Sequence, residues 1–325
     1  MQTERKSIFS NPIVLIIVAL LCNALWGSAT PAIKTGYELL EIEGVASIML
    51  FAGIRFTLAG IFTVIIFSIA RRKFLFPKKE NFTRVLTVSA FQTVIQYIFF
   101  YLGLAYTTGV KGTVTSGSGA FFAVIIASLI FKQEKLTVKK ILACVIGFAG
   151  IVIINFNGLT FTDDPMDILG VVFVLLSTVS NSCSSVLIKK FSAHEDPVVI
   201  SGYQFIVGGI FMVAVGLIAG GEIHVSNFGG VAILIYLALL SAVAYSLWGL
   251  LLKSNPVSRV TIFNFMTPVF GVLLTMLFLP SENSSVAPWN LVITLFLVCL
   301  GIFLLNYNPQ KKEAEAEAIE EVKDK

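Results

Sequence analysis

The fold of this chain is decided by residues 109–155, GVKGTVTSGSGAFFAVIIASLIFKQEKLTVKKILACVIGFAGIVIIN. One charge-free apolar run, 112–131, and a second, 141–162, flank the basic turn Lys132–Lys140. About twenty apolar residues in a helix, each rising about 1.5 Å, span the hydrocarbon core of a bilayer. The stretch therefore predicts a membrane-spanning helical hairpin whose turn lies at a water interface.

The composition is typical of an integral membrane protein. Of the 325 residues, 56% are hydrophobic and 13% are charged, whereas a soluble domain carries about 25% charged residues. The charged residues lie in loops and the tail, so the net charge of +4 indicates no nucleic-acid partner. The four cysteines stand inside apolar runs without CxxC spacing, so we expect no metal site, no cofactor and no disulfide framework.

Charge-free windows predict ten membrane spans in an all-α fold. The first window is too long for the apolar region of a signal peptide, so we interpret it as a retained helix. Arg55 interrupts the span predicted at 45–70, and the other nine spans carry no charge. These nine are 7–33, 85–110, 112–131, 141–162, 168–188, 197–221, 223–252, 260–281 and 283–310.

The placement of lysine and arginine predicts the orientation of the spans. Alternate loops collect most basic residues on one side, including those of 71–84 and 132–140. The other side holds only Lys34 and Lys111 among basic residues, together with most of the loop carboxylates. We therefore expect a multi-pass protein of the cytoplasmic membrane with both termini in the cytoplasm.

An internal repeat appears when the chain is shifted by about 150 residues. Each predicted half holds five spans, which is an odd number, so the second copy is expected to be inverted relative to the first. Inverted repeats are typical of secondary transporters. The aligned pairs include Phe56 and Phe205, Gly60 and Gly209, Tyr97 and Tyr245, Glu134 and Glu282, and Asn155 and Asn306.

Three motifs and their order resemble the EamA family of the drug/metabolite transporter superfamily. LWGSATPAIK (25–34) is similar to the family's first helix, and FKQEKLT (131–137) resembles its acidic hinge. MTPVFGVLL (266–274) is close to the proline-bearing ninth helix, while Ala120 stands where the fourth helix usually has proline. The resemblance covers about 13–307 and implies small-molecule transport through a cavity lined by helices one, three, four, six, eight and nine.

The resemblance and the span count together predict the domain organisation. A cytoplasmic segment, 1–12, precedes the first five-helix repeat, 13–155, and an external linker, 156–167, leads to the second repeat, 168–307. The charged segment 308–325 forms a cytoplasmic tail.

Arg55 is the only fully ionisable residue deep in a predicted span, where a charge is costly unless it is paired or hydrated. Two interpretations stay open at this stage. Arg55 provides a counter-charge for a substrate carboxylate or a polar gate, or it is a structural anchor that bonds to helix-end carbonyls or pairs with the loop Glu38–Glu43. Its aligned residue in the second half is the uncharged Gln204.

Polar and aromatic residues recur at aligned places in both halves. Thr93, Tyr97 and Phe100 are spaced i, i+4, i+7 on one helix face, and Ser241, Tyr245 and Trp248 repeat the pattern. These faces suit a cavity wall or ordinary aromatic packing. Asn23 lies near an expected break at Gly27–Pro31, and Asn181 lies in SNSCSS (180–185). Both suit a midplane site or close helix contact. The predicted cavity residues are Asn23, Trp26, Arg55, Gln92, Gln96, Tyr97, Phe100, Asn181, Gln204, Tyr245, Trp248 and Asn264.

These features predict a secondary transporter that works by alternating access. The expected cargo is a small neutral or zwitterionic, amino acid-like metabolite, moved outward. The alternatives are a quaternary amine or other small organic cation as cargo, and a polytopic membrane protein that transports nothing. No Walker loop or catalytic set is present, so we expect no enzyme activity. The expected partners are the small-molecule substrate and the lipid bilayer, with the protein a monomer or homodimer.

Overall fold

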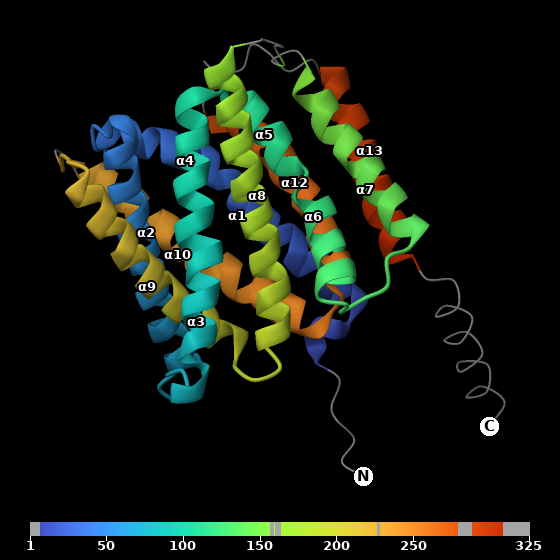
Figure 1. Cartoon of the computed structure of the whole chain (residues 1–325), viewed down its shortest axis with the longest axis horizontal. Coiled ribbons are helices and arrows are strands. Elements are labelled where there is room, and N and C mark those ends of the chain that lie inside the picture. Colours follow the sequence, from blue (N-terminus) through green and yellow to red (C-terminus); the bar gives the residue numbers. More distant parts are fainter. Residues whose placement is uncertain (1–6, 157–158, 160–163, 226–227, 279–287, 308–325) are drawn as a thin grey trace.

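The computed structural model describes residues 7–156, 159, 164–225, 228–278 and 288–307. All regular structure in these residues is helical, and the helices lie side by side in one bundle (Figure 1). Nine helices of the described chain are long and apolar enough to cross a membrane. They are Pro12–Leu39, Gly44–Ala70, Lys79–Tyr106, Gly109–Ile130, Pro165–Phe191, Pro197–Ile218, Phe228–Ser254, Val257–Phe278 and Trp289–Asn306.

Six of the nine long helices are regular throughout, and the other three contain an irregular turn. A π-helical turn, Ala90–Ile95, joins α3 to α4; α6 ends in another, Ile126–Ile130; and a 3-10 turn, Ile262–Phe265, joins α11 to α12. The bounds are α1 (Pro12–Leu39), α2 (Gly44–Ala70), α3 (Phe82–Ser89), α4 (Gln96–Tyr106), α5 (Gly109–Gly117), α6 (Gly119–Ile125), α7 (Val138–Ile154), α8 (Pro165–Phe191), α9 (Pro197–Ile218), α10 (Phe228–Ser254), α11 (Val257–Thr261), α12 (Met266–Phe278) and α13 (Pro288–Asn306).

The opening stretch forms the predicted helical hairpin, but its second arm is shorter than the apolar run. The helix α7 has 17 residues, about 25 Å of helix against about 30 Å of hydrocarbon. It begins at Val138 because the Thr137 side chain accepts a hydrogen bond from the Lys140 backbone. It ends at Ile154, where the Asn155 amide turns back to the Ile151 carbonyl at 2.9 Å. The predicted span 141–162 is wrong at both ends, and the count of ten spans stays a prediction.

The helix break predicted at Gly27–Pro31 is wrong. Helix α1 runs unbroken through Gly27 and Pro31, and α8 runs unbroken through 180–185. Gly27 serves close packing, because a Cβ there would lie 2.6 Å from the Cβ of Phe270. In α8 the Ser184 hydroxyl donates to the Asn181 carbonyl at 2.7 Å within the helix, and the Ser180 hydroxyl donates to the Phe91 carbonyl of a neighbouring segment at 2.6 Å.

The fourth and ninth spans are interrupted instead. The helix α5 ends at Gly117 and α6 begins at Gly119, so this span is interrupted at Ser118, with Ala120 in place of the family's proline. The ninth span carries its 3-10 turn just ahead of Pro268. Glycine in one span and proline in the other therefore mark the same feature in the two halves.

The helices pack in pairs that run through the bundle. Helix α2 lies along α9, α7 lies along α13, α1 contacts α10 and α12, and α8 contacts α4 and α6. Glycine allows the closest of these contacts. A Cβ on Gly53 would lie 2.5 Å from the Val213 nitrogen, and one on Gly209 would lie 2.5 Å from the Thr57 nitrogen. Neither position accepts a larger residue without moving one helix away from the other.

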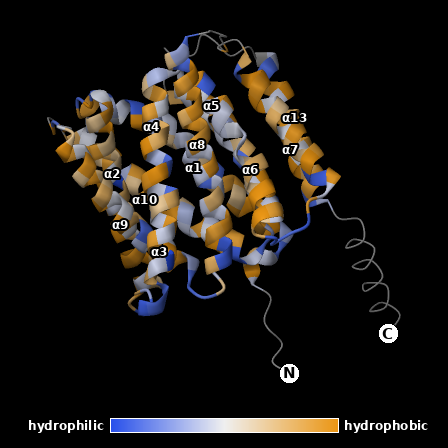
Figure 2. Cartoon of the chain, in the orientation of Figure 1, coloured by the Kyte–Doolittle hydropathy of each residue, from blue (hydrophilic) through white to orange (hydrophobic). Residues whose placement is uncertain are grey.

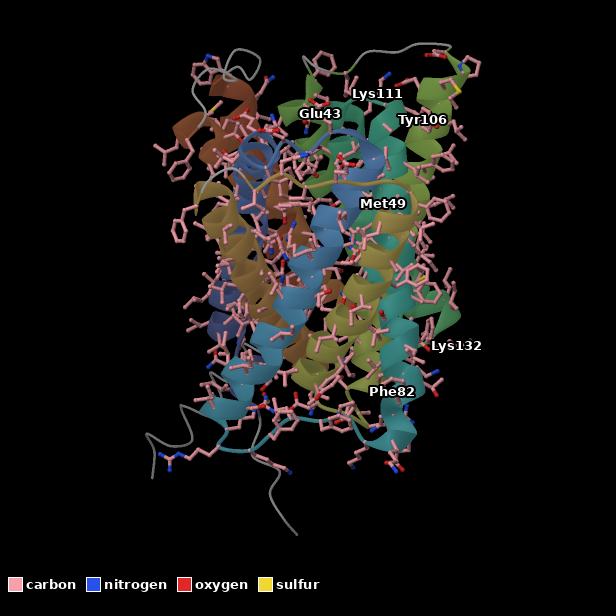
Figure 3. All side chains as sticks on the ribbon, turned by 90° about the vertical axis from the view of Figure 1, so that its left-hand side faces the viewer. Glu43, Met49, Phe82, Tyr106, Lys111 and Lys132 are labelled. Atoms are coloured by element: carbon pink, nitrogen blue, oxygen red, sulfur yellow. The ribbon has the colours of Figure 1, made fainter. Side chains whose placement is uncertain are left out.

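Hydrophobic residues dominate the length of the helices, and hydrophilic residues gather toward their ends (Figure 2). Glu43, Tyr106 and Lys111 lie at one end, which we call the acidic end, and Phe82 and Lys132 lie at the other (Figure 3). We call the second end the basic end because it holds the basic loops 71–84 and 132–140.

Both described ends of the chain lie at the basic end. The Asn255 amide donates to the Phe9 carbonyl at 2.8 Å, and the Lys139 ammonium donates to the Tyr307 carbonyl. Residues 1–6, Glu282, half of the predicted linker 156–167 and the tail 308–325 lie outside the described residues.

Candidate functional site

Seven aromatic rings meet in the middle of the bundle, and we call them the aromatic cluster. They come from α1, α2, α4, α9 and α10, and their contacts have centroid distances of 4.5 to 5.8 Å. Trp26 lies edge-on to Tyr245 at 5.1 Å and to Trp248 at 5.0 Å. The cluster consists of Trp26, Phe56, Tyr97, Tyr101, Phe205, Tyr245 and Trp248.

Two contacts in the cluster join residues that the sequence shift aligns. The rings of Phe56 and Phe205 are stacked, with centroids 5.1 Å apart and planes within 6°. The hydroxyls of Tyr97 and Tyr245 form a hydrogen bond of 3.0 Å. Aligned residues of the two halves therefore touch each other at the centre of the molecule.

Arg55 lies beside this cluster and is almost completely buried, with 4% of its surface exposed. Its Nε and Nη2 atoms donate to the Ser241 hydroxyl at 3.3 and 3.0 Å. Its guanidinium carbon lies 5.0 Å from the centre of the Phe56 ring. Arg55 forms no ion pair with a carboxylate of the described residues, including the loop Glu38–Glu43. Among the described residues, the guanidinium thus has one hydrogen-bond acceptor, and that acceptor is neutral.

The aligned residue Gln204 has a more complete set of partners. It is fully buried, and its Oε1 atom accepts a 2.6 Å hydrogen bond from the Thr93 hydroxyl. Its Nε2 atom donates to Gln92 Oε1 at 3.1 Å. Thr93 is the residue that the sequence shift aligns with Ser241. The two halves therefore build the same contact, once with a charged residue and once with a neutral one.

The structure brings together five of the predicted cavity residues, namely Arg55 and four members of the cluster, Trp26, Tyr97, Tyr245 and Trp248. Phe100 lies at the edge of the cluster, 5.8 Å from Tyr101.

The predicted polar residues lie in several environments. Asn23 donates to the Ala19 carbonyl at 2.7 Å and accepts from the Thr267 hydroxyl at 2.6 Å, so it joins α1 to α12. The Gln92 Oε1 atom accepts the hydrogen bond from Gln204 Nε2. Asn181 and Asn264 are half-buried, and their side chains make no hydrogen bond with another described residue.

Three polar atoms near the centre are buried without a hydrogen-bond partner in the described part of the chain. They are Trp26 Nε1, Gln96 Oε1 and Ser246 Oγ. Buried polar atoms are usually paired, so each such atom needs an explanation. Trp26 belongs to the aromatic cluster, and Ser246 lies between the cluster residues Tyr245 and Trp248 in the sequence. Trp26 therefore brings into the aromatic cluster a donor that has no partner in the described residues.

The sequence analysis missed Phe56, Phe205 and Tyr101 as members of the centre. The repeat contained a signal for two of them, because the sequence shift aligns Phe56 with Phe205. Two aligned residues on facing helices come into contact where the two halves meet. In the described residues, no group of His, Cys, Asp or Glu could hold a metal ion.

A bundle of apolar spanning helices around a polar, aromatic centre defines a multi-pass membrane protein with the features of a transporter. The model of the EamA-like transporter family matches residues 13–156 and 168–307. The chain therefore belongs to the EamA-like transporter family, within the drug/metabolite transporter superfamily, and the resemblance found in the motifs is confirmed.

Relatives from several organisms match most of the chain. An uncharacterized transporter of Archaeoglobus fulgidus is 25% identical over 89% of this chain and 97% of its own length. A WAT1-related chloroplastic protein of Arabidopsis thaliana is 23% identical over 87% of this chain and 67% of its own length. A crystal structure with 15% identity superposes with a TM-score of 0.72 and covers 89% of this chain and 97% of its own, which shows a shared fold. The protein is a membrane transporter.

Proposed function

We propose that this transporter exports a small neutral or zwitterionic metabolite, of the amino acid type, across the cytoplasmic membrane by alternating access. The observation that carries the proposal is the state of Arg55. A guanidinium with 4% exposure is bonded to a single neutral hydroxyl. An isolated charge in a spanning helix is costly, so such a residue is a functional-site hypothesis by default.

The chemistry of the guanidinium selects the kind of ligand. Arginine has five N–H donors in a planar fork, and the Ser241 hydroxyl takes only two of them. A carboxylate matches this fork with two parallel, charge-assisted hydrogen bonds. We therefore assign the carboxylate of the substrate to Arg55.

The aromatic cluster supplies the surface for the remainder of the substrate. Its tryptophan and tyrosine rings suit an apolar side chain, and the unpaired Trp26 Nε1 and Ser246 Oγ atoms can hydrogen-bond a polar group. A quaternary amine would also favour aromatic rings through cation–π attraction. The Arg55 charge, 5.0 Å from the Phe56 ring, opposes that cargo.

The packing of the two halves supports inverted repeats and alternating access. Gly53 packs against Gly209, and Gly60 packs against Gly202. The sequence shift aligns Gly53 with Gly202 and Gly60 with Gly209. Gly53 therefore packs against the counterpart of Gly60, and Gly60 packs against the counterpart of Gly53, as in a two-fold interface. Rocking of two such repeats about their shared axis is the usual motion of transporters built this way.

The path of the chain supports ten spans. The described chain begins and ends at the basic end, which requires an even number of crossings. The nine long helices become ten when α7 is included, and lipid thinning or tilting accommodates a short helix at modest cost. The basic end then faces the cytoplasm, as the distribution of lysine and arginine indicates. The outward direction of transport rests on the resemblance to exporters of the family.

A counterflow experiment in proteoliposomes tests the proposal. Vesicles containing the purified protein are loaded with a mixture of unlabelled amino acids, and the entry of labelled amino acids is measured. We expect saturable exchange that excess amino acids inhibit and choline-like amines do not. Inhibition by choline-like amines alone would replace the proposed substrate with an organic cation, and the absence of exchange for both classes would contradict the proposal.

A further inference from the structure

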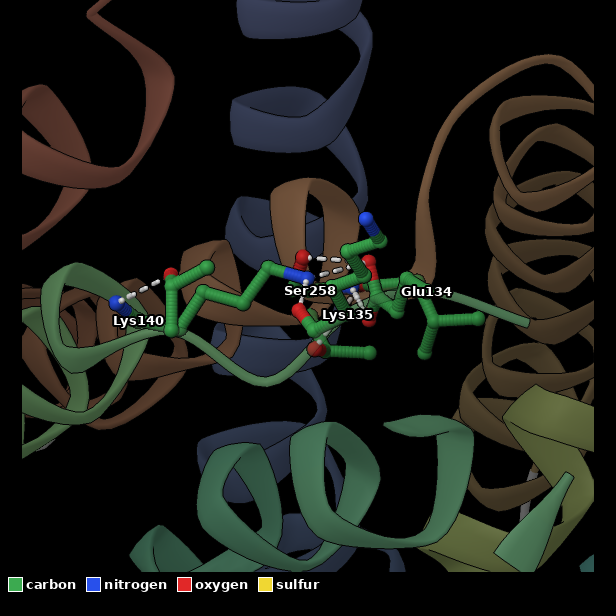
Figure 4. A network of polar contacts seen from close by, with 7 residues as sticks. Glu134, Lys135, Lys140 and Ser258 are labelled. Atoms are coloured by element: carbon green, nitrogen blue, oxygen red, sulfur yellow. Dashed lines mark hydrogen bonds and ion pairs between the residues drawn. The ribbon is translucent and has the colours of Figure 1, made fainter. Parts of the chain in front are cut away.

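A buried carboxylate joins the two halves of the molecule at the basic end. Glu134 lies in the turn before α7, and 8% of its side chain is exposed. It accepts hydrogen bonds from the Ser258 backbone nitrogen at 3.0 Å and from the Ser258 hydroxyl at 2.7 Å. Ser258 belongs to the first turn of α11, in the other half of the chain (Figure 4).

Further contacts hold the turn in place. The Lys140 ammonium lies 3.1 Å from the Glu134 carboxylate and also donates to the Lys135 carbonyl at 2.6 Å. The Gln133 amide donates to the Val186 carbonyl on α8 at 3.1 Å. The turn therefore lies between α8 and α11, both of which belong to the second half, and it covers the basic end of the bundle at this place.

We infer that Glu134 and Ser258 form a latch that keeps the basic end closed. The inference rests on the alternating-access motion of the proposed function, in which contacts across one end break when that end opens. Hydrogen bonds to a charged group are roughly twice as strong as neutral ones, and a nearly buried pair is weakly screened. A contact of this kind has two discrete states, made and broken, as switching elements require.

The latch is separate from the proposed substrate site. None of its residues belongs to the aromatic cluster or bonds to Arg55. Weakening it is therefore expected to change the populations of the closed and open states without changing the substrate contacts.

A thiol reporter behind the turn measures the opening directly. Ser185 is 5% exposed on α8 and precedes Val186, which is bonded to the turn. We place Ser185→Cys in a chain whose four native cysteines are replaced by alanine, in proteoliposomes, and add a membrane-impermeant methanethiosulfonate reagent to either side. No substrate is needed, so the result does not depend on the identity of the cargo.

We expect Glu134→Gln to increase the labelling rate of the reporter about tenfold, as the loss of a hydrogen bond to a charged group implies. Ser258→Ala, which removes one of the two bonds, is expected to give a smaller increase and replaces the first variant if that variant is not monodisperse. The control is Lys135→Gln, because Lys135 enters the network only through its carbonyl.

Equal labelling rates in Glu134→Gln, Ser258→Ala and the parent would overturn the latch. A carboxylate flux that persists in that case would leave the proposed function intact. Faster labelling in the two latch variants, without any measurable carboxylate flux, would support the latch and contradict the proposed substrate.

Discussion

Arg55 and Gln204 occupy aligned positions in the two halves, and their surroundings differ in one respect. Each bonds to a hydroxyl at aligned positions, Ser241 for Arg55 and Thr93 for Gln204. Gln204 has a further side-chain partner, Gln92, whereas Arg55 has none in the described residues. Gln204 therefore has protein partners for both its carbonyl and its amide, whereas Arg55 is a cation with unused donors.

The difference supports the proposal that Arg55, and not Gln204, binds the charge of the substrate. A duplicated bundle needs the polar contact in both halves to join helices, which the neutral pair does at low cost. The charged copy adds only the contact of the guanidinium with the Phe56 ring, and it carries the penalty of a buried charge. We therefore attribute the charge to substrate binding.

Arg55→Gln makes the two halves alike and is the largest expected change. We expect kcat/KM for carboxylate transport to fall about 100-fold, or about 2.7 kcal/mol, because the substrate carboxylate loses its charged partner. The measurement is initial flux in proteoliposomes at matched protein content. Unchanged kinetics would assign Arg55 to structure.

Exchanging the two residues sharpens the comparison. We expect Arg55→Gln combined with Gln204→Arg to recover about tenfold of the lost flux, since the guanidinium then lies beside the same aromatic cluster. Recovery is incomplete because the Gln92 carbonyl, at 3.1 Å from the present amide, competes for the new cation. A folded double variant that is no more active than Arg55→Gln would show that the two positions are not equivalent.

Gln92→Leu removes the hydrogen bond between Gln204 and Gln92 and leaves the Gln204 side chain without its second partner. We expect a loss of about 1 kcal/mol of stability, and a Tm lowered by a few degrees, since side-chain hydrogen bonds within membranes average about 0.6 kcal/mol and an orphaned donor costs more. Carboxylate flux is expected to stay within about twofold of the parent. A fall in flux well beyond twofold, with only the expected loss of stability, would place this contact in the substrate site.

Tyr97→Phe removes the hydrogen bond between the aligned tyrosines and keeps the ring. We expect KM to change about threefold, which corresponds to one membrane hydrogen bond of about 0.6 kcal/mol. Tyr203→Phe is the matched control, because its hydroxyl donates to the Leu75 carbonyl at 3.0 Å, away from the cluster. Equal effects of the two substitutions would deny the tyrosine pair a role in binding.

Much of the fold was predictable from hydropathy, because a bilayer accepts only long apolar helices. The bounds of α2 and the turn after 131 agree closely with the sequence pattern. The break expected at Gly27–Pro31 was wrong, because composition does not distinguish a kink from a close helix contact such as that of Gly27 with Phe270. The early end of α7 depends on the Asn155 side chain, which no apolar window detects.

Some residues of the centre were predictable from the sequence, but their contacts were not. Arg55 stood out in the sequence as a charge in an apolar span, and the tyrosines stood out as a repeated stripe. Asn23, by contrast, looked equally available and is bonded to Thr267 and its own helix. Whether a polar side chain faces a ligand or a neighbour depends on tertiary contacts that one sequence does not contain.

The most direct test of a carboxylate-binding Arg55 is the flux ratio between an amino acid and its carboxamide, measured in proteoliposomes with the parent protein and with Arg55→Gln. The account predicts that the parent transports the amino acid about 100-fold better than the carboxamide, and that the variant transports the two at similar, low rates. The same preference for the carboxylate in both proteins would contradict it.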